Sequence, residues 1–247
     1  MKCLILAAGY ATRLYPLTEN FPKPLLEVGG KTILDHLIDD IDLSGKVSEY
    51  IVVTNHKFAA YFEKWALGKK GKPCISVVDD GTSTNETRLG AVKDILFAVE
   101  KRGVNEDLLV IAGDNLLDFS LCGFIKYAEN KKASCIMRYY EPSFEKLLKC
   151  GVVTVDSDDL VTEMTEKSPN PATHWCCPPF YYYTRADLSL VPKGIESGCG
   201  TDAPGSFVAW LCGQTRVYAM EMPGSRYDIG NLESYRRVCD EYKGISR

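Results

Sequence analysis

The rest of the chain is arranged around the stretch Lys2–Pro24, KCLILAAGYATRLYPLTENFPKP. It opens with an apolar run from Cys3 to Ala7, which is long enough for one buried strand. The loop that follows consists of small residues, whose backbone N–H groups can come close to a phosphate chain. Arg13 can fork onto phosphate oxygens, and Lys23 can place a point charge on another phosphate. The stretch therefore predicts a buried strand followed by a phosphate-binding loop.

The spacing of this loop fits neither G-x-x-x-x-G-K-[ST] nor G-x-G-x-x-G, the two common phosphate-binding motifs. It resembles instead the signature of the sugar-1-phosphate nucleotidyltransferases, L-A-G-G-x-G-T-R-L-x-P-x-T followed by a lysine beside proline. The matching residues run from Leu6 to Thr18 and from Lys23 to Leu25. Two glycines of the pattern are replaced by Ala8 and Ala11, which are also small. The resemblance covers essentially the whole chain, and its most specific motifs lie before residue 115.

Apolar runs alternate with amphipathic stretches in the first half of the chain, which favours parallel strands covered by helices. The pattern predicts strands at 3–7, 50–54, 75–78, 108–112, 133–139, 151–155, 160–166, 175–183 and 216–221. It predicts helices at 33–43, 58–65, 91–101, 121–131, 186–191, 206–211 and 232–242. We expect an α/β fold. The resemblance implies a three-layer sandwich with a mostly parallel, Rossmann-like central sheet of the nucleotide-diphospho-sugar transferase type and a small C-terminal acceptor-binding part. Residues 1–247 are expected to form one domain, with a nucleotide-binding half (1–133) and an acceptor-binding half (134–247).

The composition of the chain argues against some classes of partner and indicates the cell compartment. The formal net charge of −4 argues against nucleic-acid and acidic-membrane partners, which favour a basic face. The chain opens directly on a core strand, with no apolar run long enough to span a bilayer. Its ten cysteines include no C-x-x-C pair, and several lie in apolar runs as free thiols would. We expect a reduced cytoplasmic protein that can form homo-oligomers. A zinc site formed by His174, Cys176 and Cys177 is a less favoured interpretation than cysteines that simply pack as apolar side chains.

The resemblance implies a reaction that joins a nucleoside triphosphate to a sugar-1-phosphate and releases pyrophosphate. Such an in-line displacement at phosphorus needs positioning and charge neutralisation more than a covalent nucleophile. Asp114 follows a buried strand, and Asp228 matches the second acidic position of the family, so the two are expected to hold Mg²⁺. The implied nucleotide-binding residues are Leu6, Ala7, Ala8, Gly9, Tyr10, Ala11, Thr12, Arg13, Asn85, Gly90 and Asp114.

Asn85 and Gly90 align with the segment that reads the base in this family. An asparagine offers both a donor and an acceptor, which suits a pyrimidine edge. Tyr10, at the tip of the first loop, is expected to crowd a purine. We therefore predict a pyrimidine triphosphate as the nucleotide substrate. Because ligands of such sheets gather at the carboxyl ends of the strands, the first loop, the 82–90 segment and Asp114 are expected to converge on one crevice.

The acceptor side departs more from the family pattern. Glu166 and Lys167 resemble its E-K-P motif, in which the glutamate bonds sugar hydroxyls and the lysine holds the acceptor phosphate. Gly151 matches the glycine at which backbone approaches the sugar, and Asp202 stands where an acidic acceptor-binding loop is expected. The usual N-A-G-x-Y strand is replaced by the sequence HWCCPPFY at 174–181. The residues expected to carry the chemistry are Arg13, Lys23 and Lys167.

Three other functions remain open at this stage. One is a cytidylyltransferase for phosphocholine or another small non-hexose phosphate, with Tyr139–Tyr140, Trp175 and Tyr181–Tyr183 forming an aromatic cage around the ammonium group, aided by Asp202. A second is a non-catalytic subunit that senses nucleotides. Retention of the charged site residues speaks against this one. The third is a dehydrogenase whose first loop binds a dinucleotide. This sequence has no acidic residue at the distance from the loop that binding the ribose requires.

Overall fold

A computed structural model of the protein describes residues 1–69 and 73–245. The chain forms two compact units. The first unit draws on Met1–Arg88, Ala112–Gly123 and Pro223–Arg247, and the second on Leu89–Ile111 and Phe124–Met222. The units interleave along the chain, so neither coincides with the predicted half 1–133 or 134–247, and the single domain stays a prediction.

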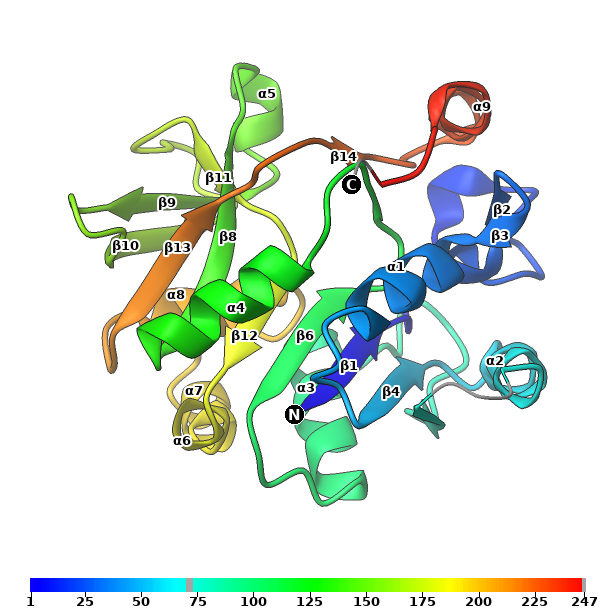
Figure 1. The fold of residues 1–247 in the computed structure, drawn as a ribbon, viewed down its shortest axis with the longest axis horizontal. Helices are drawn as coiled ribbons and strands as arrows, with labels where there is room; N and C mark the ends of the chain where they lie inside the picture. Colours follow the sequence, from blue (N-terminus) through cyan, green and yellow to red (C-terminus); the bar gives the residue numbers. More distant parts are fainter. Residues whose placement is uncertain (70–72, 246–247) are drawn as a thin grey trace. The chain divides into compact units, whose positions relative to one another are not determined.

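Three parallel strands organise the first unit: β1 (Lys2–Leu6), β4 (Glu49–Thr54) and β5 (Cys74–Asp79), with β4 in the middle (Figure 1). Every residue of β4 is buried, as expected for a strand covered on both faces. The helices of this unit are α1 (Ile33–Asp42), α2 (Ala59–Leu67) and α9 (Leu232–Glu241). These strands and helices agree with the sequence prediction to within a few residues at their ends.

Short elements of the first unit were not predicted, because two or three residues leave no periodic pattern. They are the 3₁₀ helices η1 (Thr12–Leu14) and η2 (Lys23–Leu25), the ribbon of β2 (Glu27–Val28) with β3 (Lys31–Thr32), and the ribbon of β7 (Leu116–Leu117) with β14 (Arg226–Tyr227). One buried apolar cluster, which we call the loop cluster, joins these pieces to α1 and α9. It consists of Leu14, Leu26, Val28, Ile33, Leu116, Ile229 and Val238.

The second unit contains a mixed sheet. Its strands are β6 (Leu108–Ala112), β8 (Ser134–Tyr140), β9 (Gly151–Val155), β10 (Val161–Glu166), β11 (Trp175–Cys177), β12 (Phe180–Tyr183) and β13 (Val217–Glu221). β13 runs parallel to β8, whereas β12 runs antiparallel to both β6 and β8. Its helices are α3 (Ala91–Lys101), α5 (Phe144–Leu147), α6 (Arg185–Leu188), α7 (Val191–Glu196) and α8 (Gly205–Leu211). Helix α4 (Cys122–Lys131) begins in the first unit and continues into the second.

The predicted strand at 175–183 is wrong, because the chain makes two strands there. β11 pairs with β8 and β9, whereas β12 pairs with β6 and β8. Pro178 and Pro179 lie between them, and a proline has no N–H to donate to a strand ladder. The predicted helix at 186–191 is likewise two short helices, α6 and α7.

The predicted α/β fold is confirmed, with parallel strands in the first unit and added antiparallel strands in the second. Among the described residues, no helix combines the length and the apolar character that crossing a bilayer requires.

Candidate functional site

The loop after β1 has its carbonyl groups tied to the end of β4. Asn55 donates its side-chain amide to the carbonyl of Ala8 at 3.0 Å, and Asn55 is fully buried. The backbone N–H of Ala7 donates to the carbonyl of Val53 at 2.8 Å. By contrast, the N–H groups from Ala8 to Thr12 have no hydrogen-bond partner within residues 1–69 and 73–245. Consecutive unpaired donors of this kind suit a phosphate group.

Ala11 shows how the loop tolerates the loss of a family glycine. Its backbone lies in the left-handed region (φ 47°, ψ 42°), which costs an alanine about 1 kcal/mol relative to the right-handed region. The buried Thr18 hydroxyl donates to the Ala11 carbonyl at 2.8 Å, and the N–H of Leu14 donates to the same carbonyl at 2.9 Å. These two hydrogen bonds hold the turn from which the exposed Arg13 extends.

Tyr10 does not lie at an exposed loop tip. Its side chain is 5% exposed, and its ring packs against Phe58 with the centroids 6.3 Å apart. The expectation that Tyr10 crowds a purine is therefore not supported by its position, and the pyrimidine preference rests on Asn85.

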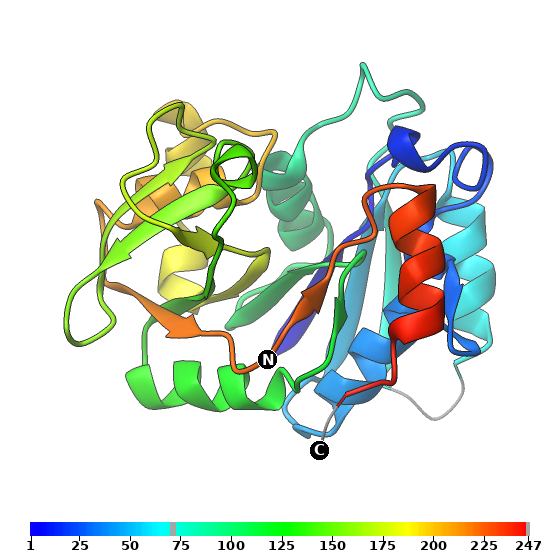
Figure 2. The same cartoon turned by 90° about the horizontal axis from the view of Figure 1, so that it is seen from above.

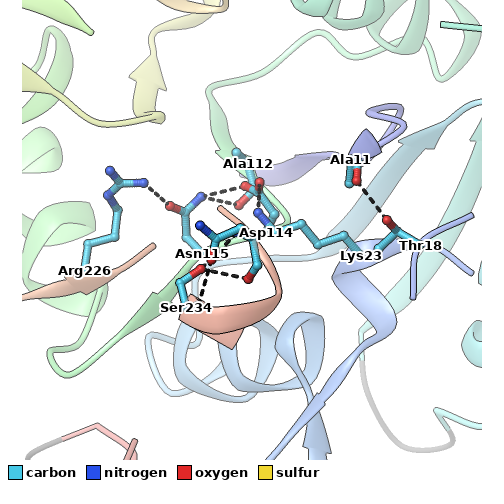
Figure 3. Close-up of polar contacts among 9 residues, drawn as sticks. Ala11, Thr18, Lys23, Ala112, Asp114, Asn115, Arg226 and Ser234 are labelled. Atoms are coloured by element: carbon cyan, nitrogen blue, oxygen red, sulfur yellow. Dashed lines mark hydrogen bonds and ion pairs between the residues drawn. The ribbon is translucent and has the colours of Figure 1, made fainter. Parts of the chain in front are cut away.

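Lys23 and Asp114 form an ion pair, with Lys23 Nζ 2.7 Å from Asp114 Oδ2 (Figure 3). The lysine side chain is 10% exposed, whereas that of Asp114 is 44% exposed and remains open on one side. Burial by itself would raise the pKa of Asp114, but the positive charges of Lys23 and Arg226 and the hydrogen bond from Lys23 outweigh it and hold that pKa below its ordinary value. Asp114 is therefore an anion at neutral pH.

Gly113 lets the Asp114 segment pass close to β1. A β-carbon there would lie 2.9 Å from Ile5 Cγ2, and the Gly113 N–H donates to the Leu6 carbonyl at 2.9 Å. The following residue, Asn115, is 1% exposed and contacts both Asp114 and Arg226. Sequence reasoning missed Asn115 and Arg226, because side-chain partners so far apart in sequence leave no local pattern.

The β7–β14 ribbon brings the Asp228 segment beside the Asp114 segment. Tyr227 pairs with Leu116 in antiparallel register, so the next position along β14 is Asp228 and the next along β7 is Asn115. Both segments are anchored by the loop cluster through Leu116 and Ile229, each fully buried. Asp228 itself is exposed. The strand register thus places the Asp228 segment beside Asn115, and the shared metal site of Asp114 and Asp228 stays a prediction.

The 82–90 segment contributes one residue of interest to each unit. The segment is drawn in teal in Figure 2. Asn85 in the first unit is exposed, and its carbonyl accepts from Arg88 Nη1 at 2.7 Å. Gly90 in the second unit has φ +90°, and a β-carbon there would lie 2.5 Å from the Thr201 carbonyl oxygen. The N–H of Ala91 donates to the Asp202 carbonyl at 3.2 Å. Gly90 therefore packs against the predicted acceptor loop.

The acceptor residues predicted in the second unit also come together. Glu166 lies at the end of β10, which pairs with β9 in the register Glu166↔Gly151. A β-carbon on Gly151 would lie 2.8 Å from Glu166 Oε2, and one on Gly205 would overlap the same oxygen. Burial raises the pKa of Glu166, although the charge of Lys167 opposes the shift. Glu166 thus sits in a cradle that two glycines keep open.

Lys167 has an unusual backbone for a non-glycine residue. Its φ is +51°, in the left-handed region, and its N–H donates to the Cys150 carbonyl at 3.0 Å. The side chain is half exposed, with Nζ 3.7 Å from Asp202 Oδ2. Lys167 therefore presents its ammonium group to solvent beside Glu166 and Asp202.

Gly205 is a site residue that the sequence did not reveal, and its replacement gives a first test. In Gly205→Ala the new methyl group should displace the Glu166 carboxylate and raise the acceptor KM several-fold, while the triphosphate KM stays within twofold. Gly213→Ala is the matched control, because a β-carbon there meets its nearest atom at an ordinary 3.5 Å. Steady-state kinetics with both substrates varied decide the matter. Equal effects on the two KM values would contradict the role given to Glu166.

The structure does not support the aromatic cage or the zinc site. Tyr181, Tyr182 and Tyr183 are at most 4% exposed and belong to the sheet core. The Trp175 ring is covered by the guanidinium of Arg138 at 4.9 Å from its centroid. Among the described residues, no group of three or more His, Cys, Asp or Glu side chains is arranged to hold a metal ion.

Comparison with known proteins identifies the family. The protein-family model described as "Nucleotidyl transferase" matches residues 2–244. Bifunctional protein GlmU of Methanocaldococcus jannaschii is 29% identical over 246 residues, which cover 98% of this chain and 55% of GlmU. UTP–glucose-1-phosphate uridylyltransferase AglF of Haloferax volcanii is 28% identical over 235 residues, which cover 94% of this chain and 93% of AglF.

Solved structures agree on the fold. A crystal structure of UDP-glucose pyrophosphorylase complexed with UDP-glucose superposes with a TM-score of 0.83 at 21% identity, covering 98% of this chain and 97% of that one. The chain thus spans about half of GlmU and nearly all of AglF. Because the family model matches almost every residue, the chain belongs to the nucleotidyl transferase family.

Proposed function

We propose that this protein joins a nucleoside triphosphate to a sugar-1-phosphate and releases pyrophosphate, which forms a nucleotide sugar. The observation that carries the proposal is the arrangement around Asp114: Lys23 is bonded to its carboxylate, and the β7–β14 register brings the Asp228 segment alongside. In this account the unpaired N–H groups of the first loop, together with Arg13, bind the triphosphate. Lys23 neutralises charge that develops at the reacting phosphate. Glu166 and Lys167 bind the acceptor.

Asp114 and Asp228 suit Mg²⁺, although no metal-binding group of three side chains exists among the described residues. Mg²⁺ prefers oxygen ligands and is usually held by one or two carboxylates, with phosphates and water completing its shell. A cation held there would neutralise phosphate charge during the displacement. Asp114, an anion open on one side, and the exposed Asp228 are the residues that would hold it.

The preference for a pyrimidine base also belongs to this proposal. It is supported by the exposed Asn85 side chain, which is available to bond a base edge, and by AglF, whose name specifies UTP. Asn85→Ala should weaken triphosphate binding by roughly 1–3 kcal/mol, because a buried polar group of the base loses its partner. It should also blur discrimination between UTP or dTTP and CTP while acceptor binding is unaffected.

Ser83→Ala is the matched control, since this residue is exposed on the same loop and has no assigned role. Triphosphate KM values for each base, measured at saturating acceptor, provide the comparison. An unchanged base preference in Asn85→Ala would remove that residue from the base site, and a wild-type preference for ATP or GTP would refute the pyrimidine proposal.

The function itself is tested by measuring pyrophosphate release from five triphosphates crossed with a panel of sugar-1-phosphates and phosphocholine. Release that needs a sugar-1-phosphate supports the proposal. Release only with CTP and phosphocholine would favour the cytidylyltransferase, and triphosphate binding without release would favour the nucleotide-sensing subunit. A cytoplasmic location and homo-oligomerisation stay predictions of the sequence.

A further inference from the structure

Asn115 is an almost fully buried amide, 1% exposed, that lies between a cation and an anion (Figure 3). Arg226 Nη1 donates to Asn115 Oδ1 at 3.0 Å. On its other side, Asn115 Nδ2 donates to Asp114 Oδ1 at 3.1 Å and to the Ala112 carbonyl at 3.1 Å. The amide therefore links the guanidinium group to the carboxylate.

The partners of Asn115 on both sides agree on which way its amide points. Arginine carries only donors, so the atom of Asn115 that faces it must be the carbonyl oxygen. The amide nitrogen must then face Asp114 and the Ala112 carbonyl, both of which accept. The guanidinium group anchors the Oδ1 end of the amide, and the two acceptors hold its Nδ2 end.

Asp114 is consequently held at both carboxylate oxygens. Asn115 donates to Oδ1 and Lys23 donates to Oδ2. Each oxygen keeps further acceptor capacity, and the side chain is 44% exposed. The two donors fix the rotation of the carboxylate and leave its open side available to a ligand.

We propose that Arg226 is a positioning residue that acts through Asn115 to hold the Asp114 carboxylate in the orientation that binds the divalent cation. This inference rests on the proposed function, in which Asp114 is a metal ligand. Removing a residue that hydrogen-bonds to a metal ligand and orients it typically lowers metal affinity or activity by about 10- to 100-fold.

The β7–β14 ribbon has fastenings that do not involve the Arg226 side chain. The ribbon is fastened by its backbone pairing and by two bonds between its flanks, from the Ser225 N–H to Asp118 Oδ1 at 2.6 Å and from the Asp118 N–H to the Ser225 carbonyl at 3.2 Å. The variant Arg226→Met keeps an unbranched apolar stem and removes the guanidinium group. It should therefore leave the fold intact, which circular dichroism and thermal melting can verify.

Measuring Mn²⁺ binding distinguishes the positioning of Asp114 by Arg226 from the effect of the Arg226 charge alone. Mn²⁺ accepts the same oxygen ligands as Mg²⁺ and is visible by electron paramagnetic resonance. Removing a positive charge near a cation site should by itself tighten cation binding. If Arg226 acts by positioning Asp114, Arg226→Met should instead weaken Mn²⁺ binding, by about tenfold. Arg226→Lys, which retains a donor and the charge, should restore most of the affinity, and Asp114→Asn should abolish the same site.

A second readout follows the amide directly. In protein labelled with ¹⁵N-asparagine, the side-chain NH₂ signals of Asn115, assigned by their loss in Asn115→Leu, should be dispersed and slow to exchange in the wild type. They should broaden or move in Arg226→Met and remain in Arg226→Lys.

The outcomes separate this inference from the proposed function. Wild-type protein that binds Mn²⁺, with Arg226→Met binding it equally or more tightly and with unchanged Asn115 signals, would overturn the positioning role alone. Wild-type protein that neither binds Mn²⁺ nor releases pyrophosphate would overturn the proposed function, and with it the purpose assigned to Arg226. Weakened Mn²⁺ binding together with altered Asn115 signals is the expected result.

Discussion

Replacing Asp114 by asparagine is expected to lower turnover by about 10²- to 10³-fold while the protein stays folded, a loss of about 3–4 kcal/mol of transition-state stabilisation. Asparagine matches the shape of the carboxylate but removes the negative charge that would hold a cation against the phosphates. The same change leaves Lys23, which is only 10% exposed, without its ion-pair partner.

The measurement is kcat at saturating triphosphate, acceptor and Mg²⁺, with thermal melting as the check on folding. Asp39→Asn is the matched control, because Asp39 lies in the same unit and also pairs with a lysine, Lys31 at 2.6 Å, but has no assigned role at the site. Near wild-type turnover in Asp114→Asn, with the control equally active, would refute the metal-ligand assignment.

The two site lysines are expected to affect different kinetic constants. Lys23 is hydrogen-bonded to the Asp114 carboxylate and so lies at the proposed reacting phosphates. Lys23→Ala should mainly lower kcat, by about 10²-fold, because the charge at the reacting phosphate is no longer neutralised. Lys167 lies beside Glu166 and Asp202 in the other unit, so Lys167→Ala should mainly raise the acceptor KM and leave the triphosphate KM almost unchanged.

Initial rates over a grid of both substrate concentrations separate these effects. Lys146→Ala serves as a control for the loss of an exposed lysine in the second unit, since its 3.7 Å contact with Glu141 lies outside the proposed acceptor residues. If Lys167→Ala raised both KM values equally, its assignment to the acceptor phosphate would be wrong.

Long periodic segments of the fold could be predicted from the sequence. Helix α3 at Ala91–Lys101 and strand β6 at Leu108–Ala112 have the predicted bounds, because a sustained pattern of buried positions specifies both the type and the length of an element. The error at 175–183 has an equally local cause. The aromatic and cysteine run favours a strand, but Pro178 and Pro179 cannot donate to the ladder.

The candidate site was predictable in its parts but not in its connections. The motif residues Lys23 and Asp114 could be named from the sequence, yet nothing in it shows that they form an ion pair. The link from Arg226 through Asn115 depends on the pairing of two-residue strands, which have no detectable periodicity. Gly205 and Glu166 likewise meet only because β10 and α8 pack together.

The proposed reaction is tested by following the phosphate groups of the triphosphate separately. With α-³²P-labelled triphosphate and a sugar-1-phosphate, we expect label to enter a nucleotide sugar, whereas γ-³²P label should appear only in pyrophosphate. Both products should depend on the acceptor and should be lost in Asp114→Asn. Transfer of the γ-phosphate to the acceptor, or acceptor-independent release of label, would contradict the proposed reaction.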